Sequence, residues 1–423
     1  MNRQFWVKVH RYAGLVMALF ILVAGLTGAV LAFAPQVDRW LNPPLPVSHQ
    51  GSLMDPLDLR ARALALAPPH GMLNGISLHL KADEPYSVAF GAHEGPGEKA
   101  PELPFNVVRL DPYTGALLEK VKITDGLWPI TRQNFLAVMI NLHYRLAIPG
   151  SVGLWLFGLA ALIWTFDCFV SLYLTFPVTV QRKDEDAEEA APSRPPGKSW
   201  LGRWKRSWLL TWKGTAYRVN FDLHRAGGLW VWMLLLVLAW TGVGFNLNEQ
   251  VYMPVMKTVF RMPDLFANMP DLRTPRPEPG LPWTEARALG RQHMAQQAQV
   301  RGFKVVSEEA LQYSPEKGMF FYAVRSDRDI AQEGGGTFMV LDGQTGAFRD
   351  LFLPTGQHPT LTFHNWIFAL HTAGVWGLPY RIFLSFTGLV ISMLCITGVY
   401  LWWKKRRARQ TLRSRQDTAP ATS

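Results

Sequence analysis

Five of the eleven histidines stand at the edges of long apolar runs, where an ionisable side chain is costly and usually functional. Any one of them alone is most simply an interfacial histidine that bonds water or lipid headgroups. The set differs, because it forms matched pairs in two halves of the chain. Two histidines on facing helices can supply both axial imidazoles of a haem iron. The five are His10, His143, His224, His364 and His371.

Sequence symmetry selects the pairs. His10 and His224 each begin an apolar run with the dipeptide His-Arg, so we predict that they hold an inner haem. His143 and His371 each follow a leucine ahead of a second run, so we predict that they hold an outer haem. His364, on the same helical face as His371, has no histidine counterpart in the first half. It is the true outer ligand, a propionate partner or a bystander, and the sequence leaves these open.

Other polar residues near the runs have two interpretations each. Arg11 and Arg225 either neutralise haem propionates or carry the positive charge that orients the chain in a membrane. Asp167, inside the second run, either bonds a neighbouring helix or relays protons. Cys168 and Cys395 also lie within runs, where small apolar packing explains them. A zinc site is the rival for a histidine cluster, but no Cys or carboxylate stands at ligand spacing. No catalytic residue is identified from the sequence.

The elements that must position these histidines are apolar helices. Each of four runs is long enough to cross a bilayer, and helices satisfy their backbone hydrogen bonds internally. A haem would pack between them against Phe, Trp, Leu and Gly side chains. The fold class predicted is therefore a membrane α-helical bundle with four transmembrane helices. The runs are about Tyr12–Phe33, Val152–Phe176, Ala226–Phe245 and Ile382–Trp403.

The distribution of basic residues predicts the orientation. The chain has a net charge of +11, and many of its basic residues lie before the first run, between the second and third, and after the fourth. The positive-inside rule then places both termini and the 178–225 loop in the cytoplasm. Residues 34–135 and 247–362 lie outside, in the periplasm of a Gram-negative cell. Because the charges flank runs and form no continuous stripe, they do not indicate nucleic-acid binding.

The two halves repeat one unit. VHRYAGL opens the first half and LHRAGGL the second, and each leads to an outer segment of about 100 residues. Each outer segment shows an amphipathic helix and alternating strands, typical of a small α+β domain. Asp111 with Thr114-Gly115 and Asp342 with Thr345-Gly346 predict the same tight turn. The repeats are parallel, and a pseudo-two-fold axis along the membrane normal would relate them.

The predicted boundaries follow from these runs. They are 1–33 (cytoplasmic N-terminus and first span), 34–135 (first outer domain), 136–177 (outer-face helix and second span), 178–225 (cytoplasmic linker), 226–246 (third span), 247–362 (second outer domain), 363–403 (outer-face helix and fourth span) and 404–423 (cytoplasmic tail).

The chain resembles a known family through HRYAGL…GLTGAVL, LHRAGGL…TGVGF, the D-x-x-T-G turns and ALHTAGVWGLPYRIFLSFTGLVISMLCITGVYLWW. These motifs are similar to those of the PepSY-associated transmembrane family, over nearly the whole chain. The resemblance implies an iron-regulated bacterial inner-membrane protein with two haem b groups and PepSY-like outer domains. It implies a ferric-siderophore reductase that passes electrons outward and releases Fe(II). The second run departs from the pattern, reading VSLYLTFP, which we interpret as a packing change without bearing on ligands.

Two other functions compete. A non-enzymatic PepSY membrane protein would bind or regulate a periplasmic protein and carry no haem. A transporter is disfavoured, because Asp167 is the only polar midplane residue identified. For the reductase, no NAD(P) or flavin fingerprint is present, so we expect a membrane quinol or a cytoplasmic reductase as electron donor. The expected partners are this donor, the ferric siderophore and membrane lipid.

Overall fold

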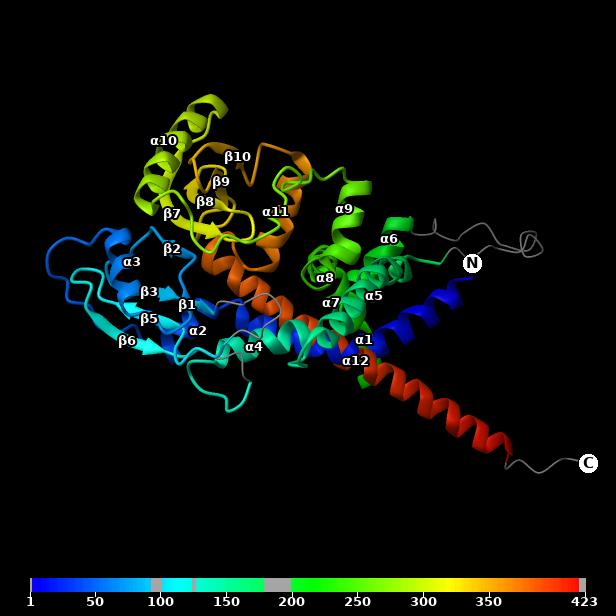
Figure 1. The fold of residues 1–423 in the computed structure, drawn as a ribbon. Helices are drawn as coiled ribbons and strands as arrows, with labels where there is room; N and C mark the ends of the chain where they lie inside the picture. The colour runs from blue at the N-terminus through cyan, green and yellow to red at the C-terminus, as the bar shows by residue number, and fades with distance from the viewer. Residues whose placement is uncertain (1, 93–100, 124–126, 179–198, 418–423) are drawn as a thin grey trace, which may run out of the picture. The chain divides into compact units, whose positions relative to one another are not determined.

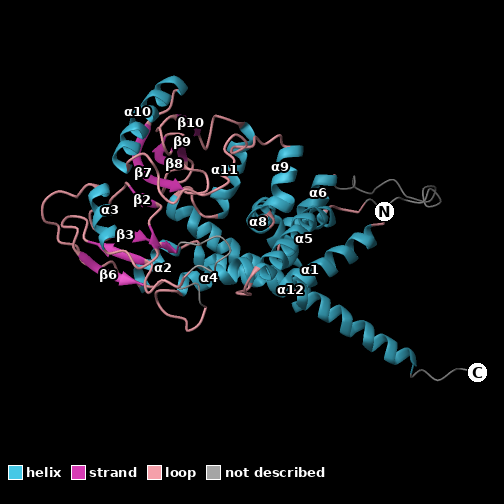
Figure 2. Ribbon diagram, viewed as in Figure 1, coloured by secondary structure: helices cyan, strands magenta, loops and turns pink. Residues whose placement is uncertain are grey.

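The computed structural model describes residues 2–92, 101–123, 127–178 and 199–417 (Figure 1). The chain divides into two compact units, each made of segments distant in sequence. The first unit is helical and comprises residues 1–33, 139–253 and 381–423. The second comprises residues 34–138 and 254–380 and contains the β-strands (Figure 2).

Three helices of the first unit are long and apolar enough to cross a membrane. They are α1 (Arg3–Leu31), α5 (Ser151–Thr175) and the Gly377–Thr411 part of α12 (Gly377–Asp417), with mean hydropathies of 2.5, 1.8 and 2.2. At 1.5 Å per residue, even α5 exceeds the roughly 30 Å of a bilayer core. The chain is therefore a membrane protein, as its apolar runs predict.

The third predicted span is not one straight helix. It is divided at Val231 into α7 (Ala216–Trp230) and α8 (Trp232–Asn246), which meet at 72°. Gly227 precedes the break and faces the tip of Met393, where a Cβ would lie only 2.9 Å from that methyl carbon. The indole of Trp232 donates to the Cys168 carbonyl at 2.8 Å, which fixes the start of α8. The two helices together form at most one span, so the residues that the structure describes contain three or four candidate spans.

Small residues bring α1 and α12 into direct backbone contact. A Cβ on Gly25 would lie 2.8 Å from the Gly388 carbonyl oxygen, and one on Gly388 would lie 2.6 Å from that of Gly25. Ser385 donates to the Ala29 carbonyl beside this crossing. Such small-residue contacts let helices associate where lipid removes the hydrophobic driving force.

Shorter helices complete the helical part of the chain. Two of them, α6 and η2, form a tryptophan-rich segment ahead of α7. The shorter helices are α2 (Ala34–Leu41), α3 (Pro56–Ala65), α4 (Phe135–Arg145), α6 (Trp200–Trp204), η2 (Lys205–Trp208), η3 (Asn248–Tyr252), α9 (Met253–Val259), α10 (Trp283–Arg301) and α11 (Pro359–His371).

The second unit is built on antiparallel sheets. A five-stranded sheet has the order β10-β9-β8-β7-β2, a three-stranded sheet the order β3-β5-β6, and β1 pairs with β4. The strands are β1 (Gly71–Met72), β2 (Gly75–Ser77), β3 (Tyr86–Ala89), β4 (Gly91–Ala92), β5 (Val107–Leu110), β6 (Leu117–Val121), β7 (Val305–Ser314), β8 (Met319–Ser326), β9 (Thr337–Asp342) and β10 (Phe348–Phe352).

The two outer segments share one core, whereas the sequence predicts a separate sheet for each. Strand β2 of the first segment pairs with β7 of the second through Gly75–Ser77 and Ala310–Gln312. Leu59 of α3 and Met294 of α10 are buried in the same apolar cluster. Figure 1 shows α10 lying along the sheet that contains β7 and β8. Strand pairing between distant segments is non-local, which local sequence patterns do not reveal.

The predicted repeated turn is confirmed in both segments. The carboxylate of Asp111 accepts from the backbone N–H groups of Tyr113 and Thr114. The carboxylate of Asp342 accepts in the same way from Gln344 and Thr345. Gly115 and Gly346 both have φ of +68°, the left-handed conformation that favours glycine.

A charge network joins the two segments. Arg287 on α10 bonds Asp55, the residue that caps α3, and Glu308 on β7, both at 2.8 Å. The Arg287 side chain is only 9% exposed, whereas that of Arg291, which also bonds Glu308, is 56% exposed. Burial alone would raise the pKa of Glu308, but hydrogen bonds from Arg291, Arg287 and Tyr322 lower it to about 2.

Replacing Arg287 is expected to destabilise the protein far more than replacing Arg291. Arg287→Met leaves Asp55 and Glu308 without the buried cation between them, a loss of about 3 kcal/mol. Arg291→Met removes a solvent-exposed ion pair worth roughly 0–1 kcal/mol. Unfolding of the detergent-purified protein, followed by tryptophan fluorescence, measures both. Equal losses of stability would contradict the network described.

The same network predicts an acid-sensitive stability. Because the folded pKa of Glu308 lies below its ordinary value of 4.5, its contribution is present above about pH 4.5 and is lost as the pH falls toward 2. Glu308→Gln is therefore expected to lower the unfolding temperature near neutral pH and to reduce its fall in acid. Parallel pH curves for the variant and the unmodified protein would refute this.

Candidate functional site

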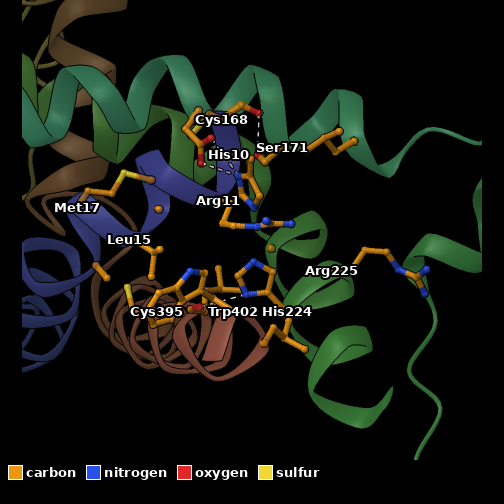
Figure 3. A pocket seen from close by; sticks show the side chains of 18 of the residues that line it. His10, Arg11, Leu15, Met17, Cys168, Ser171, His224, Arg225, Cys395 and Trp402 are labelled. Carbon is orange, nitrogen blue, oxygen red and sulfur yellow. Dashed lines mark hydrogen bonds and ion pairs between the residues drawn. The ribbon is translucent and has the colours of Figure 1, made fainter. Parts of the chain in front are cut away.

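The site is a cavity of about 450 Å³ inside the helical unit, lined by α1, α5, α7, α8 and α12. Its lining is mostly apolar, including Leu15, Met17 and Ile391. His10 comes from α1 and His224 from α7, and Figure 3 shows both rings directed into the same space. This volume lies within the range of small-molecule and cofactor sites.

The structure brings the predicted inner pair together. The ring centroids of His10 and His224 lie 6.0 Å apart, with their planes inclined at 58°. Metal–imidazole bonds of about 2.0 Å place the centroids of two trans imidazoles roughly 6 Å apart. The separation of 6.0 Å is compatible with both rings holding one metal ion.

His10 is oriented by a carboxylate on the next helix. Its Nδ1 lies 3.0 and 2.9 Å from the two carboxylate oxygens of Asp167 on α5. Asp167 is only 4% exposed. Because a carboxylate accepts hydrogen bonds, we assign the proton of His10 to Nδ1, and the lone pair of Nε2 is left for a metal.

His224 is oriented in the same manner by neutral partners on α12. Its Nδ1 lies 3.1 Å from the Leu394 carbonyl oxygen and 3.0 Å from the Thr397 hydroxyl. The Thr397 hydroxyl donates to the Met393 carbonyl, so it accepts from His224. The adjacent Gly398 admits the ring, since a Cβ there would lie 3.1 Å from Cε1 of His224. The Nδ1 of His224 therefore carries the proton, as in His10.

His143 on α4 is held by a second copy of this arrangement. Its Nδ1 lies 3.0 Å from the hydroxyl of Thr27 on α1, which itself donates to the Val23 carbonyl. A Cβ on Gly28 would lie 3.0 Å from Cε1 of His143. A Thr-Gly step thus holds a histidine in both halves of the chain. The sequence shows this dipeptide repeatedly, but only the structure reveals its role.

The departure of the second run from the family pattern coincides with a different hydrogen-bond partner for the neighbouring histidine. Aligning Tyr173-Leu174 with Tyr400-Leu401 puts Asp167 at the place of Leu394 and Val170 at the place of Thr397. The helix that lacks the threonine thus carries a carboxylate one turn earlier. Asp167 bonds a neighbouring helix, one of the two roles considered for it.

The tryptophan-rich segment fixes α7 and therefore His224. The indole of Trp204 donates to the Thr175 hydroxyl at 3.1 Å, and Ser207 donates to the Thr175 carbonyl at 2.8 Å. Arg225, next to His224, donates to the carbonyl of Arg206 in the same segment. The segment thereby ties the end of α5 to the part of α7 that carries His224.

Four basic residues line the cavity. Arg225 pairs with the fully buried Asp222 at 2.8 Å, and its side chain extends away from the hollow in Figure 3. Within the described part of the chain, its buried Nε has no hydrogen-bond partner. Arg11 is one of the residues that the sequence predicts as a propionate partner. Arg3 and Lys405 belong to the basic residues at the span ends that predict the orientation of the chain in the membrane. These cations provide positive charge around an otherwise apolar cavity.

His364 and His371 both lie on α11, in the second unit, whereas His143 belongs to the first. The ring of His364 packs against Phe368 with centroids 4.4 Å apart. The pairing of His143 with His371, and the choice between His371 and His364, stay predictions from the sequence. Among residues 2–92, 101–123, 127–178 and 199–417, no three or more His, Cys, Asp or Glu side chains form a metal-binding group.

Gly398→Leu is expected to lower the free energy of unfolding by about 1–3 kcal/mol, because its side chain would meet the His224 ring. Ile396→Leu, on the same helix but 60% exposed, is the control and should change it by less than about 0.5 kcal/mol. Unfolding of both variants in detergent measures the difference. A Gly398→Leu protein as stable as the control would show that this close approach is unimportant.

Comparison with known proteins identifies a family. The family model described as the PepSY-associated TM region matches residues 7–405. The match therefore includes all five histidines at the span edges, and it confirms the resemblance found in the motifs. A search of curated proteins found no match to the chain.

Proposed function

We propose that this chain, which belongs to the PepSY-associated transmembrane family, is a haem b electron carrier that reduces ferric siderophores outside the membrane. The observation that carries the proposal is the pair His10 and His224. Their rings lie 6.0 Å apart at a largely apolar cavity, and each has its Nδ1 engaged by a neighbouring helix. Paired imidazoles in a helix bundle are a recognised way of holding haem iron.

The residues present fit a haem in three respects. The Nε2 atoms of His10 and His224 carry the lone pairs that axial ligation requires. The apolar lining, including Leu15 and Ile391, suits a porphyrin face. The cations at the cavity, among them Arg11, suit the two propionates. A bound haem would supply a one-electron carrier that alternates between Fe(III) and Fe(II).

The protein's own part is to hold and insulate this carrier. Asp167, Leu394 and Thr397 fix the two rings through Nδ1, so little reorganisation accompanies a change of iron charge. The buried contact between Gly25 and Gly388 packs α1 directly against α12. Both features favour electron transfer over ligand binding at the iron.

A second haem is proposed from the repeat in the sequence. His143 is one expected ligand, and His371 or else His364 is the other. Two carriers near opposite faces would divide an apolar barrier of about 30 Å into shorter electron steps. The Thr-Gly arrangement around His143, shared with His224, supports a ligand role for His143.

The full architecture proposed is a four-span bundle of two parallel repeats in a bacterial inner membrane. The positive-inside rule supports cytoplasmic termini, because Arg3, Lys8 and Arg11 lie near the start of α1 and a basic stretch ends α12. The outer segments would then form the surface that meets the ferric chelate. A membrane quinol would give up two electrons and two protons, and each electron would reduce one chelated Fe(III) to Fe(II). A cytoplasmic reductase is the other donor class.

The histidine pair is expected to decide haem content. His10→Ala and His224→Ala should each abolish the same haem, and His143→Ala should remove the other. His293→Ala, on α10 of the second unit, is the matched control and should retain both. Dithionite difference spectra and quantified haem per chain measure the outcome. A purified protein without haem would end this proposal and favour the non-enzymatic role of binding a periplasmic protein.

The reductase activity has its own test. The protein in vesicles, supplied with a reduced quinol, should release Fe(II) from an external ferric hydroxamate or catecholate, detected with a ferrous chelator. His10→Ala should remove this release, and His293→Ala should not. A haem-loaded protein that reduces neither chelate would restrict the proposal to electron transfer with another acceptor.

A further inference from the structure

The two histidines at the cavity are held by partners of different charge. Asp167 accepts from His10, whereas the carbonyl of Leu394 and the hydroxyl of Thr397 accept from His224. We propose that Asp167 is a positioning residue that makes His10 the more electron-rich ligand and lowers the reduction potential of the haem between them. This inference rests on the proposed function.

The chemical reason lies in the shared proton. A carboxylate that accepts from Nδ1 draws the proton away from the ring and raises the electron density on Nε2. The more basic nitrogen stabilises Fe(III) more than Fe(II), so the one-electron reduction of the iron becomes less favourable. The neutral acceptors of His224 attract its Nδ1 proton less strongly than a carboxylate does.

The charge of the carboxylate acts in the same direction. Asp167 lies within α5 and is only 4% exposed, so its field is weakly screened. A ferric haem core with two neutral imidazoles carries one positive charge, which the carboxylate balances, whereas the ferrous core carries none. The basic residues of the lining oppose this field, but Arg225 is paired with Asp222.

Geometry alone does not require a carboxylate here. The Nδ1 contacts of His224 are 3.0 and 3.1 Å with neutral acceptors, nearly the same as the 2.9 and 3.0 Å of His10. On α12 the position equivalent to Asp167 is Leu394. There the Leu394 carbonyl and the Thr397 hydroxyl accept the hydrogen bond from His224. Asp167 therefore differs from the acceptors of His224 in its negative charge and not in its hydrogen-bond distance.

The test is a redox titration of the purified full-length holoprotein, followed by its optical spectrum. Asp167→Asn retains an oxygen that can accept from Nδ1 but removes the charge. It is expected to shift the midpoint potential of one haem to a more positive value with haem content unchanged. Asp167→Glu should restore a potential near that of the unmodified protein. Thr397→Val, the matched change beside His224, should give a smaller shift.

A second readout uses the haem-free protein. Nitrogen chemical shifts of His10 should report a proton on Nδ1 in the unmodified protein and a weakened hydrogen bond in Asp167→Asn. A potential unchanged in haem-loaded Asp167→Asn would overturn the inference and leave the proposed function standing. Loss of haem in this variant, regained in Asp167→Glu, would also overturn it, because the charge would then serve ligation. Absence of haem from the unmodified protein would instead refute the proposed function.

Discussion

The helical unit depends on one constraint, that a histidine ring inside an apolar bundle must satisfy its Nδ1 hydrogen bond within the protein. Water is scarce there, and an unsatisfied polar group is expensive. His143, His10 and His224 each meet the constraint through an acceptor on an adjacent helix: Thr27, Asp167, and the Leu394–Thr397 turn. Each bond also decides where the opposite nitrogen points. The contacts that satisfy the buried rings are therefore the same ones that would orient them as ligands under the haem proposal.

The irregular features of the bundle follow from bringing these rings close to their acceptors. Gly28 and Gly398 leave room for the imidazoles of His143 and His224. Helix α7 carries the charged residues Asp222 and Arg225, whereas α8 contains no charged residue. The two helices meet at a bend of 72° instead of forming one straight span. The tryptophan-rich segment bonds Arg225, and the ion pair between Asp222 and Arg225 lies beside His224 on the same helix. The bend separates the helix that carries His224 from a helix whose residues are mostly apolar.

Much of this arrangement could be predicted from the sequence, and the remainder could not for identifiable reasons. Apolar length gave the spans, the repeated His-Arg start gave the pair His10 and His224, and the Asp-x-x-Thr-Gly pattern gave both turns. The pairing of β2 with β7 was not predictable, because strand register between distant segments leaves no local pattern. Asp167 stands out in the sequence as a charged residue in an apolar run. Its hydrogen-bond partner, however, depends on how α5 is rotated against α1, which hydropathy does not specify. The role of Thr-Gly was hidden because a threonine in an apolar helix normally bonds its own backbone, as Thr27 and Thr397 also do.

The departure from symmetry at Asp167 carries the most information about function. A carboxylate inside a membrane-spanning helix is costly, and a neutral side chain with the reach of threonine demonstrably holds a histidine elsewhere in this bundle. If orientation were the only requirement at His10, a threonine hydroxyl would be sufficient, as it is at His143 and His224. The carboxylate contacts the His10 ring, and the four basic residues of the lining contribute positive charge to the same cavity. Under the haem proposal, a cationic iron centre held by Nε2 of that ring would add positive charge close to Asp167 and would offset part of the cost of burying this carboxylate.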